Sequence, residues 1–192
     1  MTALPKQAKL ATLFKQAVVI PVLTIEKVEH AVPLAKALVA GGVRTLEVTL
    51  RTDAAVEAAK AIIAEVPDAI VGIGTILNPD DLARAKALGA RFGISPGLTP
   101  ELLIAAAASD LPFAPGIATA SELMRALAGP FPNVRFCPTG GIGDANAATW
   151  LAEPNVLCVG GSWVCPPAEI RAANWAGITA MCDSAMKSLK RP

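Results

Sequence analysis

The sequence predicts an α/β protein, a TIM-type (β/α) barrel of parallel strands. Short β-branched runs recur at intervals of roughly 20 to 27 residues, and an alanine-rich helical pattern follows each of them. The runs are apolar on both faces, which is typical of parallel strands covered by helices. Polar residues and glycines gather where the runs end, at the edge where such barrels build their sites.

The elements are predicted in chain order. A helical leader is expected at 6–16. Strands are predicted at 18–24, 45–51, 70–76, 92–96, 113–117, 134–138 and 156–160, with helices at 27–40, 53–65, 79–88, 100–108, 120–128, 144–151 and 173–189. Capping signals open three helices, at Thr52-Asp53, Asn78-Pro79 and Thr99-Pro100. The count is seven strands, one fewer than a barrel of this type contains.

Composition indicates one domain over residues 1–192. The chain is 53% hydrophobic and 17% charged, and its net charge of +1 points to neither nucleic acid nor a membrane surface as a partner. No apolar run has the ~20 residues of a membrane span. The four cysteines form no C-x-x-C pair and are interpreted as thiols of a cytoplasmic protein. No metal or cofactor is expected, and His30, the single histidine, is predicted to be solvated.

A carboxylate lies within a predicted strand. Alternation places Thr45, Glu47 and Thr49 on one face, the barrel interior. Burial raises the pKa of a carboxyl group, so Glu47 is a candidate acid/base; the alternative is a structural Glu that is satisfied by Arg51 or by the backbone. The planar guanidinium of Arg51 suits a carboxylate or a phosphate. The Thr75 hydroxyl can bind the same anion, or it can cap a helix.

Two glycine-rich turns end the last two predicted strands. They are Thr139-Gly140-Gly141 and Gly160-Gly161-Ser162. Consecutive N–H groups at such turns bind anions, and barrels of this type commonly hold phosphate after their last two strands. We therefore predict a phosphate site at Gly140, Gly141, Gly161 and Ser162, with two ordinary turns as the alternative.

The motifs resemble those of a known family, the 2-keto-3-deoxy-6-phosphogluconate (KDPG) aldolases, which also cleave 4-hydroxy-2-oxoglutarate (KHG). The resemblance runs nearly end to end and in order. It rests on Ala31–Leu38, Gly41–Thr52, Gly72-Ile73-Gly74-Thr75, Ile94-Ser95-Pro96-Gly97, Pro115-Gly116-Ile117, Arg135–Ile142 and Gly160-Gly161-Ser162-Trp163.

The resemblance implies a homotrimer of eight-stranded barrels and metal-free class I chemistry of the Entner–Doudoroff pathway. A lysine on strand 6 forms an imine with the keto carbon, and cleavage of KDPG yields pyruvate and glyceraldehyde 3-phosphate. By motif, Glu47 is the acid/base, Arg51 and Thr75 bind the pyruvyl carboxylate, and Pro96 lines the pocket. Gly140, Gly141, Gly161 and Ser162 match the phosphate site.

The sequence departs from the family pattern at one place. The strand-6 segment is expected between Ser121-Glu122-Leu123-Met124 and Ala128-Gly129-Pro130-Phe131, but here only Arg125-Ala126-Leu127 separates the two strings. About one βα unit is missing, and no lysine occurs between Lys86 and Lys187. Three hypotheses follow: an aldolase by family whose chain does not form the imine, a non-catalytic protein that binds phosphorylated 2-keto acids, or a catalyst in which Glu47 enolises a keto acid.

Overall fold

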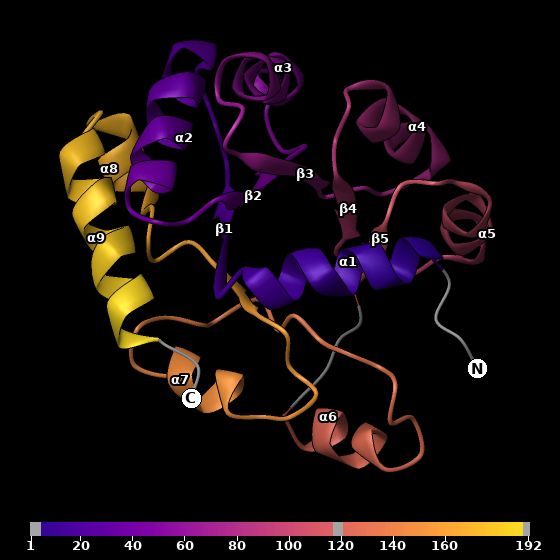
Figure 1. Cartoon of the computed structure of the whole chain (residues 1–192). Helices are drawn as coiled ribbons and strands as arrows, with labels where there is room; N and C mark the ends of the chain where they lie inside the picture. Colours follow the sequence, from indigo (N-terminus) through magenta and orange to yellow (C-terminus); the bar gives the residue numbers. More distant parts are fainter. Residues whose placement is uncertain (1–4, 117–120, 190–192) are drawn as a thin grey trace.

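The computed structural model describes residues 5–116 and 121–189, in which six parallel strands form a single curled sheet (Figure 1). The strands are β1 (Val19–Leu23), β2 (Thr45–Thr49), β3 (Ile70–Gly74), β4 (Phe92–Ser95), β5 (Phe113–Pro115) and β6 (Val159–Gly161). Their order is β5-β4-β3-β2-β1-β6. All pairs are parallel, with Glu47 opposite Gly72 and Val19 opposite Val159. The half-barrel confirms the parallel α/β prediction.

Helices cover the outer face of the sheet (Figure 1). Their bounds are η1 (Val28–His30), α2 (Ala31–Ala40), α3 (Ala55–Glu65), α4 (Pro79–Ala87), α5 (Pro100–Ala108), α6 (Ser121–Ala128), α7 (Ala147–Leu151), α8 (Pro167–Arg171) and α9 (Trp175–Ser188). The outward strand residues Leu46, Val48 and Ile73 pack with helical residues such as Leu34 and Ile62 in the main core. No helix in the described ranges is long and apolar enough to cross a membrane.

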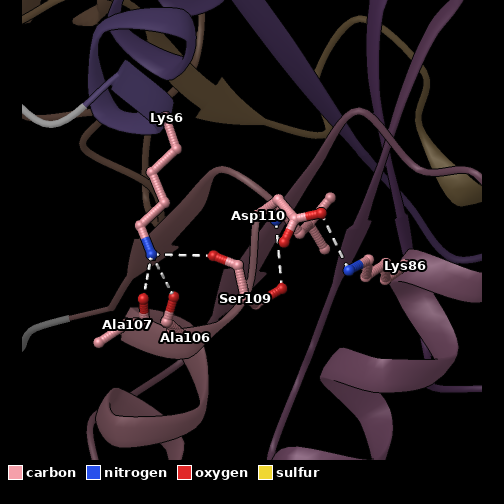
Figure 2. A network of polar contacts seen from close by, with 7 residues as sticks. Lys6, Lys86, Ala106, Ala107, Ser109 and Asp110 are labelled. Atoms are coloured by element: carbon pink, nitrogen blue, oxygen red, sulfur yellow. Dashed lines mark hydrogen bonds and ion pairs between the residues drawn. The ribbon is translucent and has the colours of Figure 1, made fainter.

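Helix α1 (Pro5–Gln16) crosses the amino-terminal end of the sheet (Figure 1). Its Phe14 ring meets the Phe92 ring of β4 edge-on, with centroids 5.3 Å apart. At the other end of α1, Lys6 donates to the carbonyl oxygens of Ala106, Ala107 and Ser109, where α5 ends (Figure 2). The leader therefore closes one end of the half-barrel and leaves the carboxyl ends of the strands open.

The prediction of a regular strand at 134–138 is wrong. Single parallel bridges join Phe136 to Val156 and Thr139 to Gly160, so this segment lies beside β6 without forming a ladder. Within the described ranges nothing pairs with the other edge of this segment, so these bridges hold it from one side only. The sheet is therefore open between this segment and β5.

Side-chain caps explain where α4 and α5 begin, whereas the cap predicted for α3 does not form. The side chains of Asn78 and Thr99 accept hydrogen bonds from the backbone N–H groups of Asp81 and Leu102, as predicted. The predicted cap at Thr52 is wrong, because its hydroxyl donates instead to the carbonyl of Ile25 at 2.5 Å.

Other predictions differ in detail. Helix α8 was not predicted. His30 is half-buried rather than solvated, with its ring edge-on to Trp175. The predicted ends at Ile117 and Ala120 lie outside the described residues.

Candidate active site

Glu47 lies in the middle of β2 and faces the inside of the curled sheet. Thr45 and Thr49 share this face, as the alternation predicts, and all three polar side chains are buried. Glu47 is only 5% exposed, whereas its neighbours Leu46 and Val48 pack outward against the helices. The strand pattern therefore places a carboxyl group in the barrel interior.

The surroundings of Glu47 make its carboxyl group a weaker acid than that of an exposed glutamate. Burial raises the pKa of its carboxyl group from 4.5 to about 7, and the positive charge of Arg51 partly opposes this rise. No hydrogen bond from the described part of the chain reaches the carboxylate. A group that is half-protonated near neutral pH can both accept and donate a proton, as acid–base chemistry requires.

Arg51 and Thr75 join the carboxyl ends of β2 and β3. The Arg51 Nε atom donates to the Thr75 hydroxyl at 3.0 Å, and Leu50 N–H donates to Gly74 C=O at 3.0 Å just before them. Thr75 has a φ of 60°, a left-handed conformation that is strained for a β-branched residue. The Arg51 guanidinium makes no other hydrogen bond within the described ranges, which leaves its outer edge available to an anion.

Three threonine hydroxyls brace β2 against β1. Thr49 donates to the Leu23 carbonyl at 2.8 Å, and its hydroxyl lies 3.4 Å from that of Thr24. Thr52 makes the bond to Ile25 described above. Sequence reasoning placed Thr49 on the inner face but did not predict this bracing, since strand pairing across 26 residues is a tertiary relationship.

Pro96 lies in the bend after β4 and is exposed at the open rim. The backbone of Ser95 and Pro96 packs against Gly116, where a Cβ atom would collide with it. The buried hydroxyl of Ser95 donates to Gly97 C=O at 2.6 Å and accepts from Gly116 N–H at 3.3 Å. Ser95 therefore ties the ends of β4 and β5 together, a role that the sequence alone did not indicate.

The two predicted glycine turns lie together. Gly160 N–H donates to Pro138 C=O at 2.8 Å, and the Thr139 side chain lies over Gly160. Gly140 and Gly141 are exposed and have φ values of 101° and 65°, which glycine adopts readily. Among the described residues, no partner accepts from the N–H groups of Gly140, Gly141 and the exposed Ser162. Backbone N–H groups without a protein acceptor are available to bind an anion.

The Glu47 site and the glycine turns share one edge of the sheet. Strand β1 pairs with both β2 and β6, so a single strand separates the two sites. Neighbouring strands lie ~5 Å apart, which puts the strand ends that carry them about 10 Å from each other. This arrangement suits an elongated molecule with an anionic group at each end. No cluster of three potential metal ligands occurs in the described ranges.

The chain matches a known family along most of its length. The KDPG and KHG aldolase profile matches residues 10–128 and 122–181. The KHG/KDPG aldolase of Escherichia coli K12 is 50% identical over 196 residues, which cover 90% of this chain and 92% of that enzyme. The chain belongs to the KDPG and KHG aldolase family.

Solved structures of KDPG aldolases share the fold. The Legionella pneumophila enzyme superposes with a TM-score of 0.86 at 43% identity and covers 91% of this chain and 97% of its own. The Zymomonas mobilis ZM4 enzyme gives 0.88 at 40% identity, with coverages of 96% and 98%. These KDPG aldolases make the fold of this chain TIM-like. Homology at this level makes KDPG cleavage in the Entner–Doudoroff pathway, a lyase reaction, the function of this chain by family.

Five lysines of this chain have described contacts, and none of these contacts is with Glu47. Lys6 caps α5, Lys60 pairs with Glu57 at 2.7 Å, and Lys86 pairs with Asp110 at 3.0 Å. Lys27 is exposed beside Glu29, and Lys187 pairs with Asp183. The charged side chain that influences the Glu47 pKa is Arg51 rather than any of these amines.

Proposed function

We propose that this chain binds the pyruvyl end of KDPG at Arg51 and Thr75, moves protons through Glu47, and holds the phosphate at Gly140, Gly141, Gly161 and Ser162. Pro96 lines the pocket between them. The observation that carries the proposal is a buried carboxyl group with a pKa of about 7 beside a guanidinium, at the same sheet edge as an unpaired cluster of N–H donors. The Zymomonas mobilis structure, which contains 3-phosphoglycerate, supports a phosphate site in the family.

We also propose that about one βα unit, the one that carries strand 6, is absent from this chain. Two findings support it. The alignment with the E. coli enzyme spans 196 positions, more than the 192 residues of the whole chain, although it covers only 90% of them. The two matched family segments overlap at residues 122–128, which form most of α6. The open edge between β5 and residues 136–139 is where such a strand would pair.

The absent unit carries the imine-forming lysine of the family, so we infer that this polypeptide binds and enolises the keto acid without forming the imine. The Legionella pneumophila structure holds pyruvate as a covalent carbinolamine, the kind of adduct that an amine nucleophile forms. Here the Glu47 carboxylate removes a proton from the methyl carbon of pyruvate, the electron pair moves to the keto oxygen, and the Arg51 charge offsets the enolate. The protonated Glu47 exchanges its proton with solvent and then delivers a proton to the same carbon, while the electron pair returns from the keto oxygen.

The test uses pyruvate with the purified chain. We expect an unchanged intact mass of 19.7 kDa after borohydride treatment, together with exchange of the pyruvate methyl protons in D₂O. Glu47→Gln abolishes that exchange but still binds pyruvate. A pyruvyl adduct would contradict the absence of imine chemistry, and peptide mapping would identify the lysine. Wild-type protein that neither exchanges protons nor is stabilised by pyruvate or phosphate would contradict the binding site.

We further propose a homotrimer in the cytoplasm. The exposed apolar side chains Leu77, Leu98, Leu103 and Ile104, near the starts of α4 and α5, support a subunit interface. Within the described residues Cys137, Cys165 and Cys182 form no disulfide, which supports a reducing compartment. Light scattering coupled to size-exclusion chromatography would give the mass of the assembly, and a monomer at micromolar concentration would contradict the trimer.

A further inference from the structure

Two glycines leave the inner face of β3 without side chains. Gly72 and Gly74 are two residues apart and therefore point to the same face of the strand. Gly72 lies between Glu47 of β2 and Phe92 of β4 in the strand register, and Gly74 lies opposite Thr49. Side chains of the neighbouring strands β2 and β4 occupy the space that β3 side chains would otherwise fill.

Gly74 provides the room for the Glu47 carboxyl group. A Cβ atom on Gly74 would lie within 2.7 Å of three Glu47 atoms, Oε1, Cδ and Cγ, and real Cβ atoms do not approach neighbours so closely. The outer half of the Glu47 side chain therefore lies over Gly74 and not over Gly72, its register partner on β3. It points toward the carboxyl end of the sheet, where Thr75 follows Gly74 directly.

Phe92 prevents the carboxyl group from moving the other way. Its ring lies over Gly72, so that a Cβ atom there would collide with the ring atoms Cδ2, Cε2 and Cζ. Phe92 is fully buried and supported from below by the edge-on contact with Phe14 of α1. If the space over Gly74 were filled, Glu47 could move only outward to the open rim, toward Arg51 and water.

We propose that Gly74 is a positioning residue for Glu47: its missing side chain creates the slot that keeps the carboxyl group inside the sheet and aimed at the end of β3. The inference deepens the proposed function, because it rests on Glu47 as the proton carrier. The described charged group that acts on this carboxyl is Arg51, from the end of β2. The other side chains that surround the slot, Thr49 and Phe92, do not titrate.

The test is Gly74→Ala, read by ¹³C NMR titration of the Glu47 carboxyl in the ligand-free protein and by the pH profile of pyruvate proton exchange. We expect the Glu47 pKa to fall from about 7 toward 4.5, because the carboxyl group is displaced toward water and Arg51. We expect exchange at neutral pH to fall about 100-fold, the scale of a misplaced acid–base group. A Glu47 pKa that stays at its wild-type value in Gly74→Ala would overturn the proposal.

A matched control and a rescue separate positioning from general damage. Gly93→Ala on β4 also adds a crowded Cβ atom, 2.7 Å from Ile76 Cδ1, but not beside Glu47. It should lower stability and leave the Glu47 pKa unchanged. If Gly74→Ala does not fold, the double variant Glu47→Ala/Gly74→Ala decides: it should fold, because the new methyl group enters the vacated slot. Equal damage from Gly74→Ala with and without the Glu47 side chain would overturn the proposal.

The two proposals fail in different ways. The NMR titration of Glu47 requires no substrate, so it tests the slot even if the chain exchanges no protons from pyruvate. A wild-type chain without exchange would contradict the proposed function, whereas an unshifted Glu47 pKa in Gly74→Ala would contradict the positioning role alone.

Discussion

Arg51 and Thr75 are joined by a 3.0 Å hydrogen bond, and Thr75 accepts it from a left-handed backbone, with φ at 60°. A β-branched residue in this region costs about 1–3 kcal/mol, so the surrounding structure holds the hydroxyl at the end of β3 against a local preference. The strain lies next to Gly74 and at the predicted carboxylate site. If Thr75 binds the carboxylate as proposed, stability and ligand binding are opposed at this residue.

Thr75→Gly should separate these two effects. Glycine relieves the strain, and after its own entropic cost we expect the free energy of unfolding to rise by roughly 1 kcal/mol. Loss of the hydroxyl should weaken pyruvate binding about fivefold, the value of one hydrogen bond. Urea unfolding and an NMR titration with pyruvate measure both. Thr75→Ser keeps the hydroxyl and should bind as the wild type does; equal weakening in both variants would contradict a role for the hydroxyl.

Glu47 should make stability decrease with rising pH. Its folded pKa of about 7 lies above its ordinary value of 4.5, so the folded state holds the proton more tightly. The stabilisation is fully present below pH 4.5 and is lost as the pH rises to 7, a change of about 3 kcal/mol. The unfolding free energy of the wild type minus that of Glu47→Gln, measured in urea at pH 5 and 8, isolates this group. A difference independent of pH would show that the carboxyl is not desolvated.

Lys6 should anchor α1 to α5, as Figure 2 indicates. Its ammonium group meets three carbonyl oxygens at 2.6–2.9 Å, at the negative end of the α5 dipole. Lys6→Met keeps the aliphatic stem but removes these bonds, and we expect a loss of about 1 kcal/mol in urea unfolding. Lys9→Met, on an exposed position of the same helix, is the matched control. Comparable losses in the two variants would exclude a specific cap.

Asn155 should hold α6 in place. This buried side chain donates to the Met124 carbonyl of α6 at 2.7 Å, and nearby Glu153 pairs with Arg125 at 2.5 Å. Asn155→Leu leaves the Met124 carbonyl without this donor, at a cost of about 2 kcal/mol. Differential scanning fluorimetry should show a lower melting temperature. We expect a smaller effect from Glu153→Gln, because exposed ion pairs contribute little; the reverse order would contradict this assignment.

The local features of the fold were predictable because they depend on neighbouring residues. Asn78 and Thr99 cap helices through bonds to groups three residues away, and period-two alternation was enough to place Glu47 inside the sheet. Thr52 could not be assigned in this way, since its acceptor, the Ile25 carbonyl, is far away in sequence and near only after β1 pairs with β2. The strand predicted at 134–138 also failed for a nonlocal reason, because its pairing depends on segments far away in sequence, and within the described ranges only single bridges to residues 156 and 160 form.

The sequence by itself determined the family, the parallel α/β architecture and the identity of the polar residues at the strand ends, because motifs and hydrophobic periods are written in the order of residues. Only the tertiary structure decided how these residues act on one another. The pKa of Glu47 depends on its burial and on the charge of Arg51, its slot on Gly74 and Phe92, and the Arg51–Thr75 hydrogen bond on the pairing of β2 with β3. Each is a relationship between strands brought together by folding, with no counterpart in any single stretch of chain.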